Sequence, residues 1–153
     1  MSTYPVLSTR VIGQAEKTLN AILAQQLAGT GLTEPQWVIL TLAVTSGGTA
    51  GRERFTRMVA DALKISETDA RARIGYLVTA QQLQITGEAP AVTVTGPARQ
   101  SYGRIRTAIA GITQRLWGDL PAEDLATAGR VLAIITDRAN AELGRAQIGR
   151  AHV

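Results

Sequence analysis

Apolar residues recur along the chain with two periods, one typical of helices and one typical of strands. Between residues 9 and 28, and again between residues 33 and 46, they return every three to four positions, which predicts two helices. A Gly-Thr-Gly sequence at residues 29 to 31 ends the first helix, and Thr33 and Pro35 begin the second. The chain is therefore expected to open with one long helix and one shorter helix.

The apolar pattern between residues 55 and 83 predicts two helices joined by a tight turn. In the first half, apolar residues at helical spacing stop at Leu63, and the next two residues leave room only for a short turn. Ser66, followed three residues later by Asp69, is typical of a helix start. The core-facing stripe of the second helix comprises Ala70, Ile74, Leu77, Val78 and Gln81. Two helices joined by so few residues must cross sharply, as in a helix-turn-helix.

The opposite face of this second helix carries small residues where a solvated face normally carries Glu and Lys. Ala72 and Gly75 lie on it, with the Tyr76 ring at its border. Arg71 and Arg73 flank it on either side. Small residues let a large partner approach the backbone and arginines bind bases or phosphates, so such a helix can lie in the DNA major groove. An ordinary helical hairpin with a solvated second helix is the alternative, and this stretch alone does not decide between them.

The period changes from helical to strand-like after residue 83. Residues 84–86 and 91–95 form short extended runs, and residues 87–90 form the turn between them, which predicts a small hairpin. A helix-turn-helix followed at once by a hairpin is the winged-helix order, in which the hairpin can reach the minor groove or the DNA backbone. A hairpin can equally serve as a lid on the small core. Thr49 is expected in a loop that leads to a helix starting near Arg52.

Two long helices are predicted after the hairpin. Thr95 caps the first, which spans residues 97–117, and the second runs from about residue 121 to residue 144. The last helix has too many apolar positions for a lone peripheral helix, so it needs a partner, either the first helix or a second copy of the chain. The expected fold class is mainly α with a small β-hairpin (α+β), a winged helix-turn-helix with long N- and C-terminal helices.

Composition removes several classes of chemistry. The 153-residue chain has no cysteine, and its one histidine, His152, is the penultimate residue. Disulfides, thiolate catalysis and thiolate zinc sites are therefore excluded, and metal sites have almost nothing to use. No spacing of Asp, Glu, Ser and Tyr assembles a nucleophile with a base, so we expect neither an enzyme nor a cofactor. Without a long apolar run or a signal-like N-terminus, the protein is expected in the cytoplasm, with no membrane partner.

The net charge of +4 is concentrated around the predicted helix-turn-helix. Between residues 51 and 106 there are nine basic and five acidic residues, whereas the rest of the chain has seven of each. Phosphate binding is the simplest use for such a patch. A surplus of four charges is also within ordinary variation, but here it coincides with the motif.

The order of these motifs resembles the MarR family of bacterial transcriptional regulators. The resemblance covers about residues 32–143 and rests on LTEPQWVIL from Leu32, on ADALKIS before a helix ending YLVTAQQL, on VTVTGPAR from Val92, and on DLPAEDL from Asp119. It implies a homodimer joined through the terminal helices, with two winged-helix lobes on a pseudo-palindromic operator. It further implies repression that a small aromatic ligand relieves. The chain would form a single domain of residues 1–153. Within it, about residues 32–99 would form the winged helix, and residues 9–28 and 100–146 would form the dimerisation helices.

The sequence also departs from the family's pattern. The wing of the family usually carries an arginine that enters the minor groove, whereas the tip here, residues 87–90, has none, which puts insertion of the wing in question. Ala72 stands where an arginine is common, and Ala98 stands where the family has glycine. A different sequence preference is therefore expected. A winged-helix module for protein–protein association, without sequence-specific DNA binding, is the alternative function.

Three sets of residues are candidates for the sites. The expected DNA contacts are Thr49, Arg52, Ser66, Thr68, Arg71, Arg73 and Arg99, with Thr49, Arg52 and Arg99 on the DNA backbone. The expected dimer interface includes Leu19, Ile22, Val131, Ile135 and Leu143. If a ligand controls the protein, its expected neighbours are Trp37, Leu40, Tyr102, Ile105 and Ile109. Each of these five is equally well explained as ordinary core.

Overall fold

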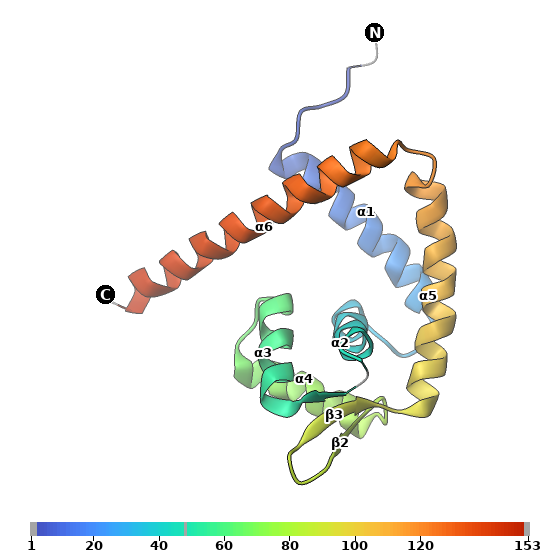
Figure 1. Cartoon of the computed structure of the whole chain (residues 1–153), viewed down its shortest axis with the longest axis vertical. Helices are drawn as coiled ribbons and strands as arrows, with labels where there is room; N and C mark the ends of the chain where they lie inside the picture. Colours follow the sequence, from blue (N-terminus) through green and yellow to red (C-terminus); the bar gives the residue numbers. More distant parts are fainter. Residues whose placement is uncertain (1–2, 48, 152–153) are drawn as a thin grey trace. The chain divides into compact units, whose positions relative to one another are not determined.

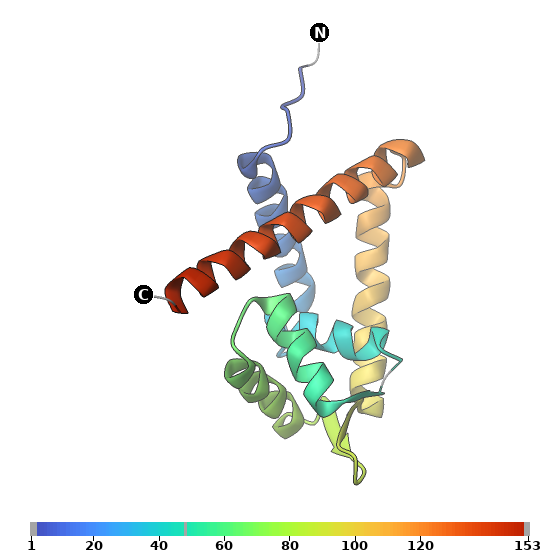
Figure 2. The same cartoon turned by 60° about the vertical axis from the view of Figure 1, so that its left-hand side comes forward.

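The computed structural model describes residues 3–47 and 49–151, and within them the chain forms six helices and three short strands (Figure 1, and turned by 60° in Figure 2). In chain order the elements are α1 (Thr9–Leu27), α2 (Glu34–Thr45), β1 (Thr49–Gly51), α3 (Arg52–Leu63), α4 (Glu67–Thr79), β2 (Leu83–Thr86), β3 (Ala91–Val94), α5 (Gly96–Trp117) and α6 (Ala122–Ala151). The expected fold class, mainly α with a small β element, is confirmed. None of the helices described is both long and apolar enough to cross a membrane.

The chain divides into two compact units, Met1–Gly111 and Ile112–Val153. The first unit holds the elements from α1 to β3 and most of α5. The second unit holds the end of α5 and the whole of α6, so α5 runs across the boundary between them.

Helices α2 and α4 begin where the sequence places capping side chains. At α2, Thr33 Oγ1 accepts a hydrogen bond from the Gln36 amide, and Gln36 Oε1 accepts one from the Thr33 amide, which completes a capping box. At α4, Ser66 Oγ accepts a hydrogen bond from the Asp69 amide at 3.0 Å. These bonds satisfy amides that have no partner inside the helix, and they explain why the helix starts were predictable from the sequence.

Three expectations about the limits of the elements were wrong. Thr49 begins a third strand instead of lying in a loop, because residues 49–51 pair with β3 in a sheet of order β1-β3-β2. Gln81 lies beyond α4, exposed and with a positive φ of 62°, instead of on its buried stripe. The last helix continues through Gly144 to Ala151, since a glycine inside a helix weakens it without ending it.

A core of buried side chains joins α2, α3, α4, the sheet and α5. In β3, Val92 and Val94 are buried while Ala91 and Thr93 are partly exposed, as the alternation of a strand requires. The largest fully buried side chains are Phe55, Ile39, Leu40, Leu77, Leu83, Val59, Val92 and Thr56. This core fixes the inner face of α4 and so decides which of its residues face outward.

Thr95 joins the segment that follows α4 to the start of α5. Its hydroxyl donates to the Gln81 carbonyl at 2.8 Å and accepts from the Ala98 amide at 3.3 Å. Its own amide donates to the Gln82 carbonyl at 3.1 Å, and the residue is buried. One side chain therefore caps α5 and ties its start to the end of α4.

We expect Thr95→Val to lower the free energy of unfolding by about 1–3 kcal/mol, because the change keeps the shape but removes both hydroxyl hydrogen bonds. Thr95→Ser keeps both bonds and should lose less. Thr93→Val is the matched control, since the Thr93 hydroxyl makes only a long 3.5 Å contact with the Gln84 carbonyl. Urea unfolding followed by circular dichroism measures the differences. A Thr95→Val protein within about 0.5 kcal/mol of wild type contradicts this role.

Candidate nucleic-acid interface

Helix α4 has one buried face and one open face. Ala70, Ile74 and Leu77 are buried in the core, as the sequence pattern predicted. On the other side Ser66, Thr68, Arg71 and Arg73, the four α4 residues expected at DNA, are all exposed. The structure thus presents these four side chains to solvent from one rigidly packed helix and its capping residue, which is the requirement for reading a groove.

The small residues on the open face are not required by packing. A Cβ atom added at Gly75 would meet no heavy atom within 4 Å outside the neighbouring backbone of its own helix. Ala72 is also exposed. Glycine inside a helix costs stability relative to alanine, so an open glycine at this position favours a reason outside the fold, such as the close approach of a partner.

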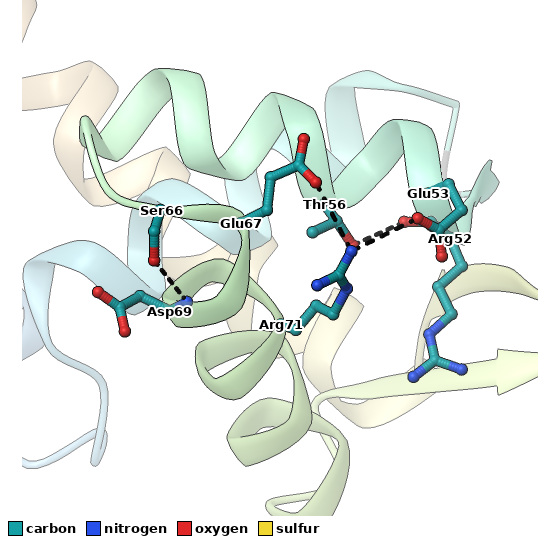
Figure 3. A network of polar contacts seen from close by, with 7 residues as sticks. All are labelled: Arg52, Glu53, Thr56, Ser66, Glu67, Asp69 and Arg71. Carbon is teal, nitrogen blue, oxygen red and sulfur yellow. Dashed lines mark hydrogen bonds and ion pairs between the residues drawn. The ribbon is translucent and has the colours of Figure 1, made fainter. Parts of the chain in front are cut away.

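Arg71 is the centre of a small ionic network that links α4 to the start of α3 (Figure 3). Its Nη2 atom lies 3.6 Å from Glu67 Oε2, one helical turn before it, and 3.8 Å from Glu53 Oε2 on α3. The spacing of Glu67 and Arg71 could have revealed the first contact, but nothing in the sequence indicates the second. Exposed ion pairs of this kind contribute less than about 1 kcal/mol to stability, so their main effect is to orient the Arg71 guanidinium.

The expected contacts with the DNA backbone come from three other elements. The Arg52 amide donates to the Pro90 carbonyl at 2.9 Å, which joins α3 to the turn of the wing, while the Arg52 side chain is exposed and points away from Arg71 (Figure 3). Arg99 is exposed in the first turn of α5. Thr49 pairs with Thr93 through its backbone, and its side chain lies outside the part of the chain described.

A basic hollow beside the turn of the wing was not anticipated from the sequence. It has a volume of about 480 Å³, and its walls include three arginines and one carboxylate of α3 together with the wing turn: Arg52, Glu53, Arg54, Arg57, Ala89 and Pro90. The arginine-free wing tip therefore lies next to arginines of α3. The pairing of β1 with β3 and the hydrogen bond from the Arg52 amide to the Pro90 carbonyl bring these segments together, and neither leaves a periodic signal in the sequence.

The five residues expected near a ligand lie on α2 and α5. The rings of Trp37 and Tyr102 are stacked with their centroids 4.5 Å apart, and the Tyr102 hydroxyl contacts Thr41 Oγ1 at 3.3 Å. Leu40 is buried in the same cluster. Further along α5, Ile105 is buried and Ile109 is partly buried. The stacked pair is an aromatic surface and also part of the core, so both interpretations from the sequence stay open.

A larger hollow, of about 730 Å³, lies elsewhere, where the end of α4 meets β2 and the start of α5. Its walls include Gln81, Leu83, Thr95 and Pro97. It does not involve the stacked rings. Among the residues described, no group of three or more Asp, Glu, His or Cys side chains is placed to hold a metal ion, and His152 lies outside them.

The residues expected at a dimer interface are open to solvent in the single chain. Leu19, Ile135 and Leu143 are exposed, and Ile22 and Val131 are partly buried. In α6, none of the residues whose side chains are described is buried. The exposed large apolar residues of this helix are Leu125, Leu132, Ile134, Ile135 and Leu143. Such an apolar surface on one long helix is typical of an association surface.

Solved structures similar to this chain are transcriptional regulators. Ligand-free NadR is 18% identical over 88% of this chain and 98% of its own, with a TM-score of 0.72, and NadR bound to 4-hydroxyphenylacetate also matches. A MarR-family regulator from Rhodococcus sp. RHA1 is 14% identical over 82% of this chain and 89% of its own, with a TM-score of 0.65. BpsR of Bordetella bronchiseptica, whose DNA binding is regulated by 6-hydroxynicotinic acid, is 21% identical over 89% of this chain and 99% of its own. Its TM-score is 0.66.

By sequence, neither a protein-family model nor a curated protein matches the chain. At identities of 14–21% the structural likeness establishes the fold, and the fold is the winged helix of MarR-family regulators. The resemblance inferred from the motifs is therefore confirmed for the fold.

We expect Gly75→Ala to raise the free energy of unfolding by about 0.5–1 kcal/mol, because alanine is the better helix residue and the space is open. Gly75→Leu should fold equally well but weaken duplex DNA binding by about tenfold or more, because the side chain stands where the partner approaches. Gly103→Leu is the control, at an exposed and equally open glycine of α5. Thermal unfolding and fluorescence anisotropy measure the two effects. A Gly75→Leu protein that binds DNA like wild type removes the close-approach role.

Proposed function

We propose that this chain, with its MarR-type winged-helix fold, is a transcriptional regulator that binds duplex DNA sequence-specifically through the open face of α4. The observation that carries the proposal is the division of that helix into a buried face and an exposed face of small and basic residues. The concentration of positive charge between residues 51 and 106 supports it. So do regulators of the same fold, among them BpsR, a DNA-binding protein.

In this proposal the α4 residues and Ser66 contact bases and nearby phosphates, and the flanking segments contact the backbone. Ser66, Thr68, Arg71 and Arg73 are the candidates in the major groove. Thr49, Arg52 and Arg99 are the candidates on the backbone. The basic hollow beside the wing adds Arg54 and Arg57 to the positive surface that faces the phosphates.

The proposal predicts binding that is strongly salt-dependent and selective. A duplex selected from random DNA should bind more tightly than a scrambled duplex, and six or more phosphate contacts would weaken binding about a thousandfold between roughly 50 and 200 mM salt. Arg71→Ala should cost about 1–3 kcal/mol of discrimination, whereas Arg99→Ala should weaken both duplexes alike and lower the salt slope by about one. Fluorescence anisotropy measures both quantities.

Two results would contradict parts of this proposal. If Arg71→Ala left both affinity and sequence preference unchanged, Arg71 would not belong to the interface. If wild-type protein showed no salt-dependent affinity for any duplex, the alternative of a protein–protein module would be favoured. The exposed, arginine-free wing tip that carries Glu88 is the feature that keeps this alternative in view.

We further propose that the regulator works as a homodimer and that residues 1–153 act as one domain within it. The interface would include Leu19 and Ile22 of α1 and Val131, Ile135 and Leu143 of α6. The exposed apolar residues of α6 support this, because a stable monomer rarely leaves so many large apolar side chains open on one helix. An obligate interface of this kind buries upward of about 2,000 Å².

Sedimentation equilibrium at micromolar concentration is expected to give twice the chain mass of 16.2 kDa. Ile135→Glu should lower the observed mass towards that of the chain, because a charge among the exposed apolar side chains of α6 cannot be desolvated at low cost. Ala126→Glu, on the opposite side of the same helix and also exposed, is the matched control and should stay dimeric. A wild-type mass of 16.2 kDa contradicts the dimer.

We also propose that the regulator is a repressor whose operator affinity falls when a small aromatic acid binds beside the Trp37 and Tyr102 rings. The stacked pair supplies an aromatic surface at the junction of α2 and α5. BpsR and NadR, which share the fold, bind aromatic acids. A ligand at this junction could shift the winged-helix core relative to the rest of α5 and so change the spacing of two lobes.

An aromatic acid such as 4-hydroxyphenylacetate is expected to quench Trp37 fluorescence in a Trp117→Phe background. It should weaken operator binding by the same factor by which operator DNA weakens binding of the acid, because coupling between two sites is reciprocal. Tyr102→Ala, which removes the stacking partner, should reduce the quenching. Quenching without reciprocity would mean a site that binds but does not regulate. Binding of the acid that leaves Trp37 fluorescence unchanged would contradict this location.

A further inference from the structure

Arg71 and Arg73 lie two residues apart on the open face of α4, yet their surroundings differ. The Arg71 guanidinium lies between two carboxylates, Glu67 on its own helix and Glu53 on α3, at 3.6 and 3.8 Å (Figure 3). Arg73 is exposed and forms no ion pair with any residue described. The two arginines that flank the open face are therefore held very differently before a partner arrives.

The geometry of the two contacts leaves Arg71 able to bind something else. Both carboxylates contact the same nitrogen, Nη2, so Nη1 and Nε take part in neither ion pair. The side chain is 46% exposed, so a partner can reach it. The distances exceed the 2.7–2.9 Å that is typical of a charge-assisted hydrogen bond, so the carboxylates orient the guanidinium by charge and leave its donors available.

The origin of the two carboxylates matters as much as the distances. Glu67 lies on the same helix as Arg71, one turn before it, so it holds the guanidinium from one side only. Glu53 comes from the first turn of α3, whose neighbouring turn is fixed in the core by Phe55 and Thr56, which are at most 2% exposed. A contact from a second, rigidly packed helix fixes the direction of the guanidinium relative to the whole domain.

We propose that Glu53 is a positioning residue for DNA recognition, because it holds Arg71 in the conformation that reads a base. Arg73, which has no such carboxylate beside it among the residues described, stays mobile and follows a phosphate. The inference rests on the proposed function. A long side chain that is already restrained loses less conformational freedom when it binds, and a base is recognised only if the donors arrive at a defined position. A phosphate, whose charge is spread over its oxygens, can be bound by a mobile arginine.

The carboxylates also oppose unselective binding at this position. Two negative charges beside one guanidinium leave this cluster with a net charge of minus one, so a nearby phosphate gains little from Arg71. The favourable contribution of Arg71 then depends on donating to the correct base. Removing Glu53 should therefore strengthen binding to any duplex and weaken the preference for the selected one, and both changes lower the discrimination.

The first test needs no DNA. The ¹⁵N relaxation of arginine Nε groups reports the mobility of each guanidinium, and in the wild-type protein Arg71 is expected to be more ordered than Arg73. Glu53→Gln should raise the mobility of Arg71 towards that of Arg73, with the pair to Glu67 still in place. Asp61→Asn, which removes an equal charge from the same helix but from a carboxylate that pairs with Lys64, should leave Arg71 unchanged. Equal mobility of Arg71 and Arg73 in the wild-type protein overturns the inference.

The second test measures the ratio of affinities for the selected and scrambled duplexes in a double-mutant cycle. Arg71→Gln is expected to lower this ratio by about 5- to 150-fold, and Glu53→Gln by about two- to fivefold. In the Arg71→Gln background, Glu53→Gln should no longer change the ratio, because its effect acts through Arg71. Arg73→Gln should lower the salt slope by about one at an unchanged ratio.

The outcomes separate this inference from the proposed function. A wild-type protein with no preference for any duplex overturns the proposed function and this inference with it. A clear wild-type preference that Glu53→Gln leaves intact overturns the inference alone. An equal fall of the ratio with and without Arg71 also overturns it, because Glu53 would then act on DNA directly.

Discussion

The arrangement of the open face of α4 depends on the three-residue connection between α3 and α4, residues 64–66. Lys64 adopts a left-handed conformation with a φ of 56°, and the Ile65 amide donates to the Ala60 carbonyl at 3.0 Å, so α3 ends sharply and α4 starts at once. The crossing that results buries Ala70 and Ile74 against the core. Every side chain on the opposite face of α4 is thereby exposed on a helix that cannot rotate without unpacking the domain.

Much of the fold could be predicted from the sequence because its signals are local. Helix starts follow capping side chains such as Thr33 and Ser66, and the buried faces follow the apolar period. The strand β1, the ion pair from Glu53 and the basic hollow could not be predicted, because each depends on segments that meet only after folding. The open face of α4 was predicted from the sequence, whereas the different environments of its two arginines became visible only in the structure.

The positive charge beside the wing comes from α3 and not from the hairpin itself. The wing turn carries no arginine, but Arg52, Arg54 and Arg57 of α3 line the hollow on the other side of that turn. The Arg52 amide and the β1–β3 pairing hold the two sides together. Positive charge is thus supplied by a helix packed in the core, and the hairpin serves as the wall beside it.

The central claim is that the open face of α4 lies in the major groove, and the absence of cysteine from the chain allows a direct test. Ala72, exposed on that face, is replaced by cysteine and coupled to an iron chelate that cleaves nearby DNA strands, with Ala126→Cys on α6 as the control. The account predicts cleavage of the selected duplex from position 72 at two sites about one helical turn apart, one for each half-site, and none from position 126. Duplex that is bound but left uncut from position 72 would contradict it.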